Sequence, residues 1–193
     1  MKKLILASQS PRRRGILEKA QIPFEVEVSH VSEETDQTKP AKIVEELAGR
    51  KAQAVFLFNP SDIVLGADTM VALGDQIFGK PKTKEEAYEM LTKLRNHVHQ
   101  VYTGVAFAFA DKNGMVKLIT HVEKTDVYVG DITDVQIRDY IESGEPMDKA
   151  GAYAIQGPFG QFIKSIDGDY YNVVGLPLYY VSHMLKKIRD RDK

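Results

Sequence analysis

Two long strand-like runs, residues 98–110 and 115–129, follow one another with only a short turn sequence, DKNG, near their junction. An Asn-Gly pair between two such runs is a strong signal for a β-hairpin. The rest of the chain mixes helical and strand patterns without a strict βαβ alternation. This order predicts an α/β protein with a long, twisted mixed sheet and argues against a Rossmann fold.

Shorter signals place the other elements. Alternating or buried apolar runs predict strands over residues 3–7, 22–28 and 62–73, the last with a bend at Gly66 and a return strand in IFGKP. Helical spacing and capping residues predict helices over residues 11–20, 40–58, 84–95 and 178–189 and one after Thr133. Residues 149–174 are rich in glycine and break into short pieces. No repeat or linker divides the 193 residues, which fit one larger domain or two tight lobes.

Composition excludes several classes of protein. The net charge of −1 argues against an extended nucleic-acid surface, so an anion site must be a local cluster. The chain has no cysteine, which excludes disulfides, thiolate metal sites and a cysteine nucleophile. No apolar run is long enough for a membrane span or a signal peptide. We therefore expect a soluble, cytoplasmic protein with no membrane or nucleic-acid partner.

The stretch ILASQSPRRRG ends a strand-like run with serines and then opens a helix with three arginines. A helix N-terminus already carries partial positive charge, so these arginines indicate that something anionic binds there. Arg12 and Arg13 have the planar donors that suit phosphate oxygens, and Ser8 and Ser10 can donate hydroxyl bonds. The alternative is a solvated arginine face with Ser10 as a plain helix cap. The motif is not a Walker A loop.

Four further groups could join a phosphate site. Asp68 ends an apolar strand at the Gly66 bend, where a carboxylate could hold a metal or take a proton from water. Lys80 in FGKP could contact phosphate, Glu33 could share a magnesium ion with Asp68, and Gln156 in a glycine loop could read a base edge. Each also has a plainer explanation as a turn residue, a solvated charge or a loop amide bonded to the backbone.

Six motifs occur together along the chain: ASQSPRR, GADT, GKP, YTGV, SGEPMDKAGAYAIQG and GDYYNVVGLP. In this order and spacing the sequence resembles the Maf family of nucleotide pyrophosphatases, from Leu4 to about Leu178. Gln9 stands where the family's first motif has glycine, while Ser8, Ser10, Arg12 and Arg13 are kept. AYAIQG resembles the branch that acts on dTTP and UTP.

The resemblance implies a single domain over residues 1–193, with two lobes around a deep cleft, and frequent homodimers. It implies hydrolysis of a nucleoside triphosphate to the monophosphate and pyrophosphate with a divalent metal, Mg²⁺ or Mn²⁺. Asp68 matches the family's catalytic acid, and Arg12, Thr69 and Gln156 match positions associated with substrate choice. Residues implied to line the cleft are Glu33, Lys51, Lys80, Lys149 and Asp167.

The phosphate contacts expected on this basis are Ser8, Ser10, Arg12, Arg13, Lys51 and Lys80, and the expected metal ligands are Asp68 and Glu33. Asp68 as general base and Asp68 as metal ligand both remain open. Two other functions also remain open: a pyrophosphatase for modified purine nucleotides, and a nucleotide-binding regulatory protein that inhibits septation. Gln156 and the effect of Asp68→Asn discriminate among them.

Overall fold

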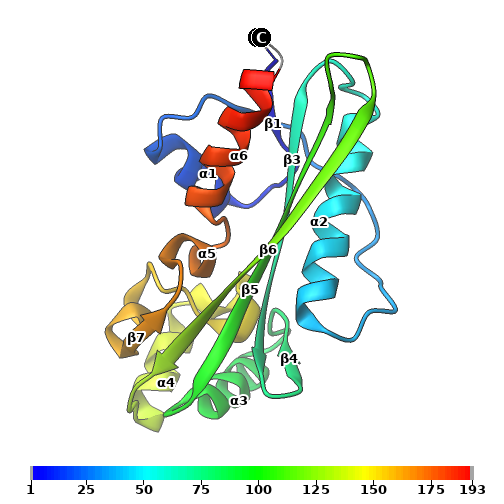
Figure 1. Cartoon of the computed structure of the whole chain (residues 1–193). Coiled ribbons are helices and arrows are strands. Elements are labelled where there is room, and N and C mark those ends of the chain that lie inside the picture. Colours follow the sequence, from blue (N-terminus) through cyan, green and yellow to red (C-terminus); the bar gives the residue numbers. More distant parts are fainter. Residues whose placement is uncertain (1, 192–193) are drawn as a thin grey trace. The chain divides into compact units, whose positions relative to one another are not determined.

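The computed structural model describes residues 2–191, which form a seven-stranded sheet with helices beside it (Figure 1). The strands are β1 (Leu4–Leu6), β2 (Glu25–Val26), β3 (Ile63–Leu73), β4 (Gln76–Phe78), β5 (Val98–Ala110), β6 (Val116–Val129) and β7 (Ile163–Asp167). The α-helices are α1 (Pro11–Lys19), α2 (Pro40–Phe56), α3 (Lys84–Leu94), α4 (Asp134–Glu142), α5 (Tyr170–Val174) and α6 (Leu178–Arg191). Three short 3-10 helices are η1 (Glu145–Asp148), η2 (Ala150–Ala152) and η3 (Pro158–Phe162).

The sheet is mixed. Its order is β2-β1-β3-β5-β6-β7, with β4 paired to β3 off this path. Strand β1 pairs in parallel with β2 and β3, whereas β3–β4 and β6–β7 are antiparallel. The predicted α/β class with a mixed sheet is confirmed. Within residues 2–191, no helix has the length and apolar character needed to cross a membrane.

The chain divides into two compact units. Unit 1 comprises residues 1–68, 103–123 and 175–193, and unit 2 comprises residues 69–102 and 124–174. Strands β3, β5 and β6 each contribute residues to both units.

The predicted hairpin is confirmed in β5 and β6. The turn between them is closed by hydrogen bonds from the Asp111 amide to the Met115 carbonyl (2.8 Å) and from the Gly114 amide to the Asp111 carbonyl (2.8 Å). Gly114 has φ +78°, a conformation that glycine adopts at no steric cost. The DKNG sequence therefore acts as the turn that its residues predict.

The predicted strand over residues 22–28 is mostly wrong, because only Glu25 and Val26 pair with β1. Pro23 has no amide hydrogen to donate to a ladder, and the Ile22 amide donates instead to the Leu17 carbonyl at the end of α1 (3.0 Å). Alternating apolar residues at this sheet edge thus produce only a two-residue strand.

In unit 1, helix α2 packs closely against the sheet through glycines. A Cβ added to Gly66 would lie 2.2 Å from the Ala48 carbonyl oxygen, and one added to Gly104 would lie 2.2 Å from the Val44 carbonyl oxygen. The predicted bend at Gly66 is wrong: β3 continues through it without interruption. Glycine is needed at this position because the α2 backbone approaches it, not because the strand turns.

In unit 2, His99 lies fully buried among core residues. Its Nε2 shares a 2.7 Å hydrogen bond with the Tyr153 hydroxyl, and among the described residues Nδ1 has no hydrogen-bond partner. Burial lowers the pKa of His99 from 6.5 to about 4, with the charge of Asp126 opposing the shift.

We expect this histidine to make folding pH-dependent. Since the pKa is lower in the folded state, the unfolded chain binds the proton first as pH falls, and stability is lost between pH 6.5 and about 4. The loss from this group should be about 3 kcal/mol. Urea unfolding at about pH 7 and about pH 4.5 measures it, with His99→Gln losing the dependence and exposed His97→Gln keeping it. An equal pH dependence in both variants would contradict the assignment.

Candidate active site

The turn between β1 and α1 forms a compact polar group in unit 1. The Ser10 side chain caps α1 by accepting a hydrogen bond from the Arg13 amide (3.5 Å). The Ser8 hydroxyl accepts bonds from the Ser10 amide (3.3 Å) and from Arg13 Nη1 (3.0 Å). Arg13 Nε donates to the Gly175 carbonyl (2.8 Å), so this side chain is held at two nitrogens, Nε and Nη1. Ser8, Ser10 and Arg13 are therefore grouped at the start of a nine-residue helix, as an anion site requires.

Charges from three other residues act on Arg13. Burial lowers the pKa of the Arg13 guanidinium, the Asp68 carboxylate raises it, Arg12 lowers it and Glu33 raises it. An arginine remains protonated despite such a shift. All four charged residues belong to unit 1 and lie close enough to influence one another.

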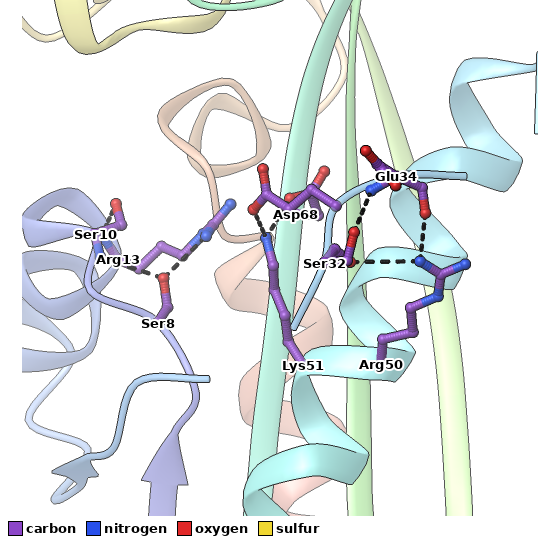
Figure 2. A network of polar contacts seen from close by, with 9 residues as sticks. Ser8, Ser10, Arg13, Ser32, Glu34, Arg50, Lys51 and Asp68 are labelled. Carbon is purple, nitrogen blue, oxygen red and sulfur yellow. Dashed lines mark hydrogen bonds and ion pairs between the residues drawn. The ribbon is translucent and has the colours of Figure 1, made fainter. Parts of the chain in front are cut away.

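Lys51 connects the two candidate carboxylates (Figure 2). Its Nζ donates to Asp68 Oδ1 and to Glu33 Oε1, each at 2.7 Å. The side chains of Lys51 and Asp68 are both 12% exposed, whereas that of Glu33 is 67% exposed. Asp68 is thus a sheltered carboxylate fixed on a strand, and Glu33 is an accessible one on a loop.

Asp68 does not end its strand, which corrects the position expected from sequence. It lies inside β3, which runs from Ile63 to Leu73. Counting backbone and side chain together, Asp68 is 8% exposed. A strand interior holds the carboxylate more rigidly than a turn, because the ladder bonds on both sides fix the backbone.

Arg50 stabilises the loop that carries Glu33 through hydrogen bonds to its backbone. Sequence reasoning did not identify Arg50 as a site residue. Arg50 Nη1 donates to the Glu34 carbonyl (2.5 Å) and to the Ser32 carbonyl (3.4 Å), on either side of Glu33 (Figure 2). Arg50 also pairs with Glu46 one helical turn earlier. In the sequence, the adjacent basic residues Arg50 and Lys51 are the only sign of this contact. Their roles can be recognised only when the loop that carries Glu33 is seen to lie against α2.

Unit 2 holds the other candidates, and two of them lie on neighbouring loops. The Gly151 amide donates to the Gly79 carbonyl (3.1 Å), which ties the turn after Lys149 to the loop containing Lys80. Lys149 Nζ donates to the Glu145 carbonyl (3.0 Å) and pairs with Asp148, whereas Lys80 is exposed.

The remaining candidates in unit 2 occupy separate elements. Thr69 is half-buried in β3, directly after Asp68 in sequence, and Asp167 is exposed at the end of β7. Gln156 is exposed in a turn closed by a bond from the Gly157 amide to the Ala154 carbonyl (3.2 Å). Their roles, like the expected cleft, stay predictions.

The model of the family described as Maf-like protein matches residues 3–188. This chain belongs to the Maf family. A dTTP/UTP pyrophosphatase of Geobacillus sp. (strain WCH70) is 49% identical over 189 residues, covering 97% of this chain and 99% of its own. One of Symbiobacterium thermophilum is 50% identical over 186 residues, covering 96% of this chain and 93% of its own. The Staphylococcus aureus Ham1 protein has a similar fold, with a TM-score of 0.50 and 14% identity over 96% of this chain and 99% of its own.

The Maf family in general implies a divalent metal, and the donor set in unit 1 fits one. Glu33 and Asp68 both form ion pairs with the Lys51 ammonium, so their oxygens already face a cation. No group of three or more acidic, histidine or cysteine side chains that could hold a metal occurs among residues 2–191. Mg²⁺ needs only one or two carboxylates when phosphate oxygens and water complete its shell. A metal brought in with a nucleotide therefore suits this pair.

Proposed function

We propose that this chain hydrolyses dTTP and UTP to the monophosphate and pyrophosphate. The observation that carries the proposal is the Asp68–Lys51–Glu33 cluster, which shares its unit with the Ser8–Ser10–Arg13 turn. Such a set supplies a base, cations and helix N–H groups to a polyphosphate. The names of the similar Maf proteins support the choice of dTTP and UTP.

The proposed reaction is attack of water on the α-phosphorus. The new bond joins the water oxygen to phosphorus, the α-phosphorus–oxygen bond to the β-phosphate breaks, and pyrophosphate leaves with that oxygen. Asp68 accepts the proton that water gives up. Its sheltered place in β3 and its 2.7 Å contact with Lys51 hold the accepting carboxylate in one orientation.

Cationic and hydroxyl groups stabilise the charge that builds on the phosphates. In unit 1 these are Arg12, Arg13, Lys51, Ser8 and Ser10, and in unit 2 Lys80. Arg13 is already oriented by Ser8 and the Gly175 carbonyl, so little freedom is lost when it binds phosphate.

Of the two carboxylates, Glu33 is the better placed to meet an incoming hydrated Mg²⁺ or Mn²⁺, because its side chain is 67% exposed. As the proton acceptor, Asp68 would contact the metal through water. The bound metal would polarise the phosphate oxygens and lower the pKa of water.

We assign base recognition to unit 2. The Gln156 amide offers a donor and an acceptor, which match the O4 and N3–H edge shared by uracil and thymine. Thr69 and Arg12 contribute to substrate choice, and Lys149 and Asp167 contribute further binding contacts. Cytoplasmic location and a homodimer remain predictions, the latter checked by light scattering.

A panel of nucleotides tests the proposed function. Pyrophosphate release is measured with Mg²⁺ or Mn²⁺ for dTTP, UTP, dCTP, GTP, 7-methyl-GTP and ITP. We expect turnover of dTTP and UTP at least about tenfold faster, as kcat/KM, than that of the others. Preference for a purine would contradict the role of Gln156, and tight binding without turnover would favour a regulatory protein.

A further inference from the structure

We infer that Glu145 is a positioning residue that sets the Gln156 turn in the shape that selects the base. The inference rests on the proposed function, because it takes Gln156 as the group that reads the base. It adds a residue of unit 2 whose carboxylate lies against Gly157, directly after Gln156.

The first flank is held through Tyr140 in the last turn of α4. The Tyr140 hydroxyl accepts a hydrogen bond from the Ala154 amide (3.3 Å), two residues before Gln156. Burial and the neighbouring Glu145 carboxylate raise the pKa of the Tyr140 phenol, which therefore stays protonated. Glu145 thus lies beside the phenol that holds the Ala154 amide.

The second flank is held by direct packing. A Cβ added to Gly157 would lie 2.1 Å from Glu145 Oε1 and 2.5 Å from Oε2. Gly157 has φ −95°, a value open to any residue, so its backbone conformation does not require glycine. Glycine leaves room for the Glu145 carboxylate in the space where a side chain would otherwise stand.

The Glu145 carboxylate is partly buried against this turn. Its Oε2 is buried with no hydrogen-bond partner among the described residues. A buried carboxylate oxygen without a partner is costly, and its retention indicates a purpose other than stability.

The same residue also places Lys149, since the Glu145 carbonyl accepts a bond from Lys149 Nζ (3.0 Å). Gln156 itself is exposed. Residues packed against the turn therefore hold it in place. Losing Glu145 should weaken the contact between Gln156 and the base while leaving the attack of water unchanged.

Steady-state kinetics and amide exchange on Glu145→Ala, Glu145→Gln and Tyr140→Phe test this inference. For Glu145→Ala we expect the KM for dTTP to rise about tenfold, with kcat changed less than about threefold. The preference for dTTP over dCTP should fall. Tyr140→Phe should move the same way, and Glu145→Gln should restore part of the loss because it keeps the shape. Peptides covering residues 154–157 should exchange faster in Glu145→Ala.

Glu142→Gln is the matched control, since Glu142 is an exposed residue of α4 that pairs with Lys84. Unchanged KM and selectivity in Glu145→Ala, or a fall in kcat with selectivity intact, would overturn the inference. So would unchanged amide exchange. If the parent protein turned over no nucleotide, the proposed function would fail, and the exchange data would still decide whether Glu145 orders the turn.

Discussion

Replacing Asp68 by asparagine should lower kcat for pyrophosphate release by about a thousandfold or more. Asparagine keeps the size of the side chain but cannot accept the proton from water. It also removes the charge that pairs with Lys51 in a site where both side chains are 12% exposed. Initial rates at saturating dTTP over a range of Mg²⁺ concentrations measure the effect, with circular dichroism to show that the variant folds.

One control variant and one contradicting outcome make this result specific. Asp75→Asn, in an exposed turn, should retain the parent rate. A high residual rate in Asp68→Asn at every Mg²⁺ concentration would show that Asp68 is not the proton acceptor.

Glu33→Gln should behave differently from Asp68→Asn. Because Glu33 is exposed and is assigned to the metal, its loss should raise the Mg²⁺ concentration for half-maximal rate about tenfold. Saturating Mg²⁺ should recover most of kcat. Glu34→Gln is the matched control on the same loop. If excess metal rescued Asp68→Asn but not Glu33→Gln, the two roles would be exchanged.

Local signals in the sequence predicted most elements of the fold. The Asn-Gly turn defined the β5–β6 hairpin, and Thr133 began α4 with a complete capping box. These succeed because a turn or cap depends on a few neighbouring residues. The edge strand β2 and the course of β3 through Gly66 were misjudged because both depend on partners distant in sequence.

The sequence predicted which types of residue form the candidate site better than it predicted how they are arranged in space. The SQSPRR sequence suggested either an anion site or a capped helix with a solvated arginine face, because cap, helix and arginines are contiguous. The bridge from Lys51 to Asp68 and Glu33 joins three separate segments, so no local pattern reveals it. Glu145 was missed for the same reason: its partners Tyr140 and Gly157 are recognised only when the loop is folded.

Gly66→Ala should destabilise the protein by about 3 kcal/mol. The added Cβ would lie 2.2 Å from the Ala48 carbonyl oxygen and 2.7 Å from the Ala52 amide nitrogen, both of them backbone atoms of α2. A side chain could rotate away from such a clash, but a helix backbone must shift as a whole. Urea unfolding measures the loss in free energy of unfolding.

The shift should also reach the chemistry, because α2 carries Lys51 and Gly66 precedes Asp68 by two residues. Moving the helix outward lengthens the 2.7 Å contact between Lys51 Nζ and Asp68 Oδ1, so the folded fraction should show a lower kcat. Gly15→Ala is the control, since its Cβ meets nothing within 4 Å in the middle of α1. It should stabilise the protein by about 0.5–1 kcal/mol. If Gly66→Ala lost stability and kept the parent kcat, then close packing of α2 would serve the fold alone, and the position of Lys51 would not matter for turnover.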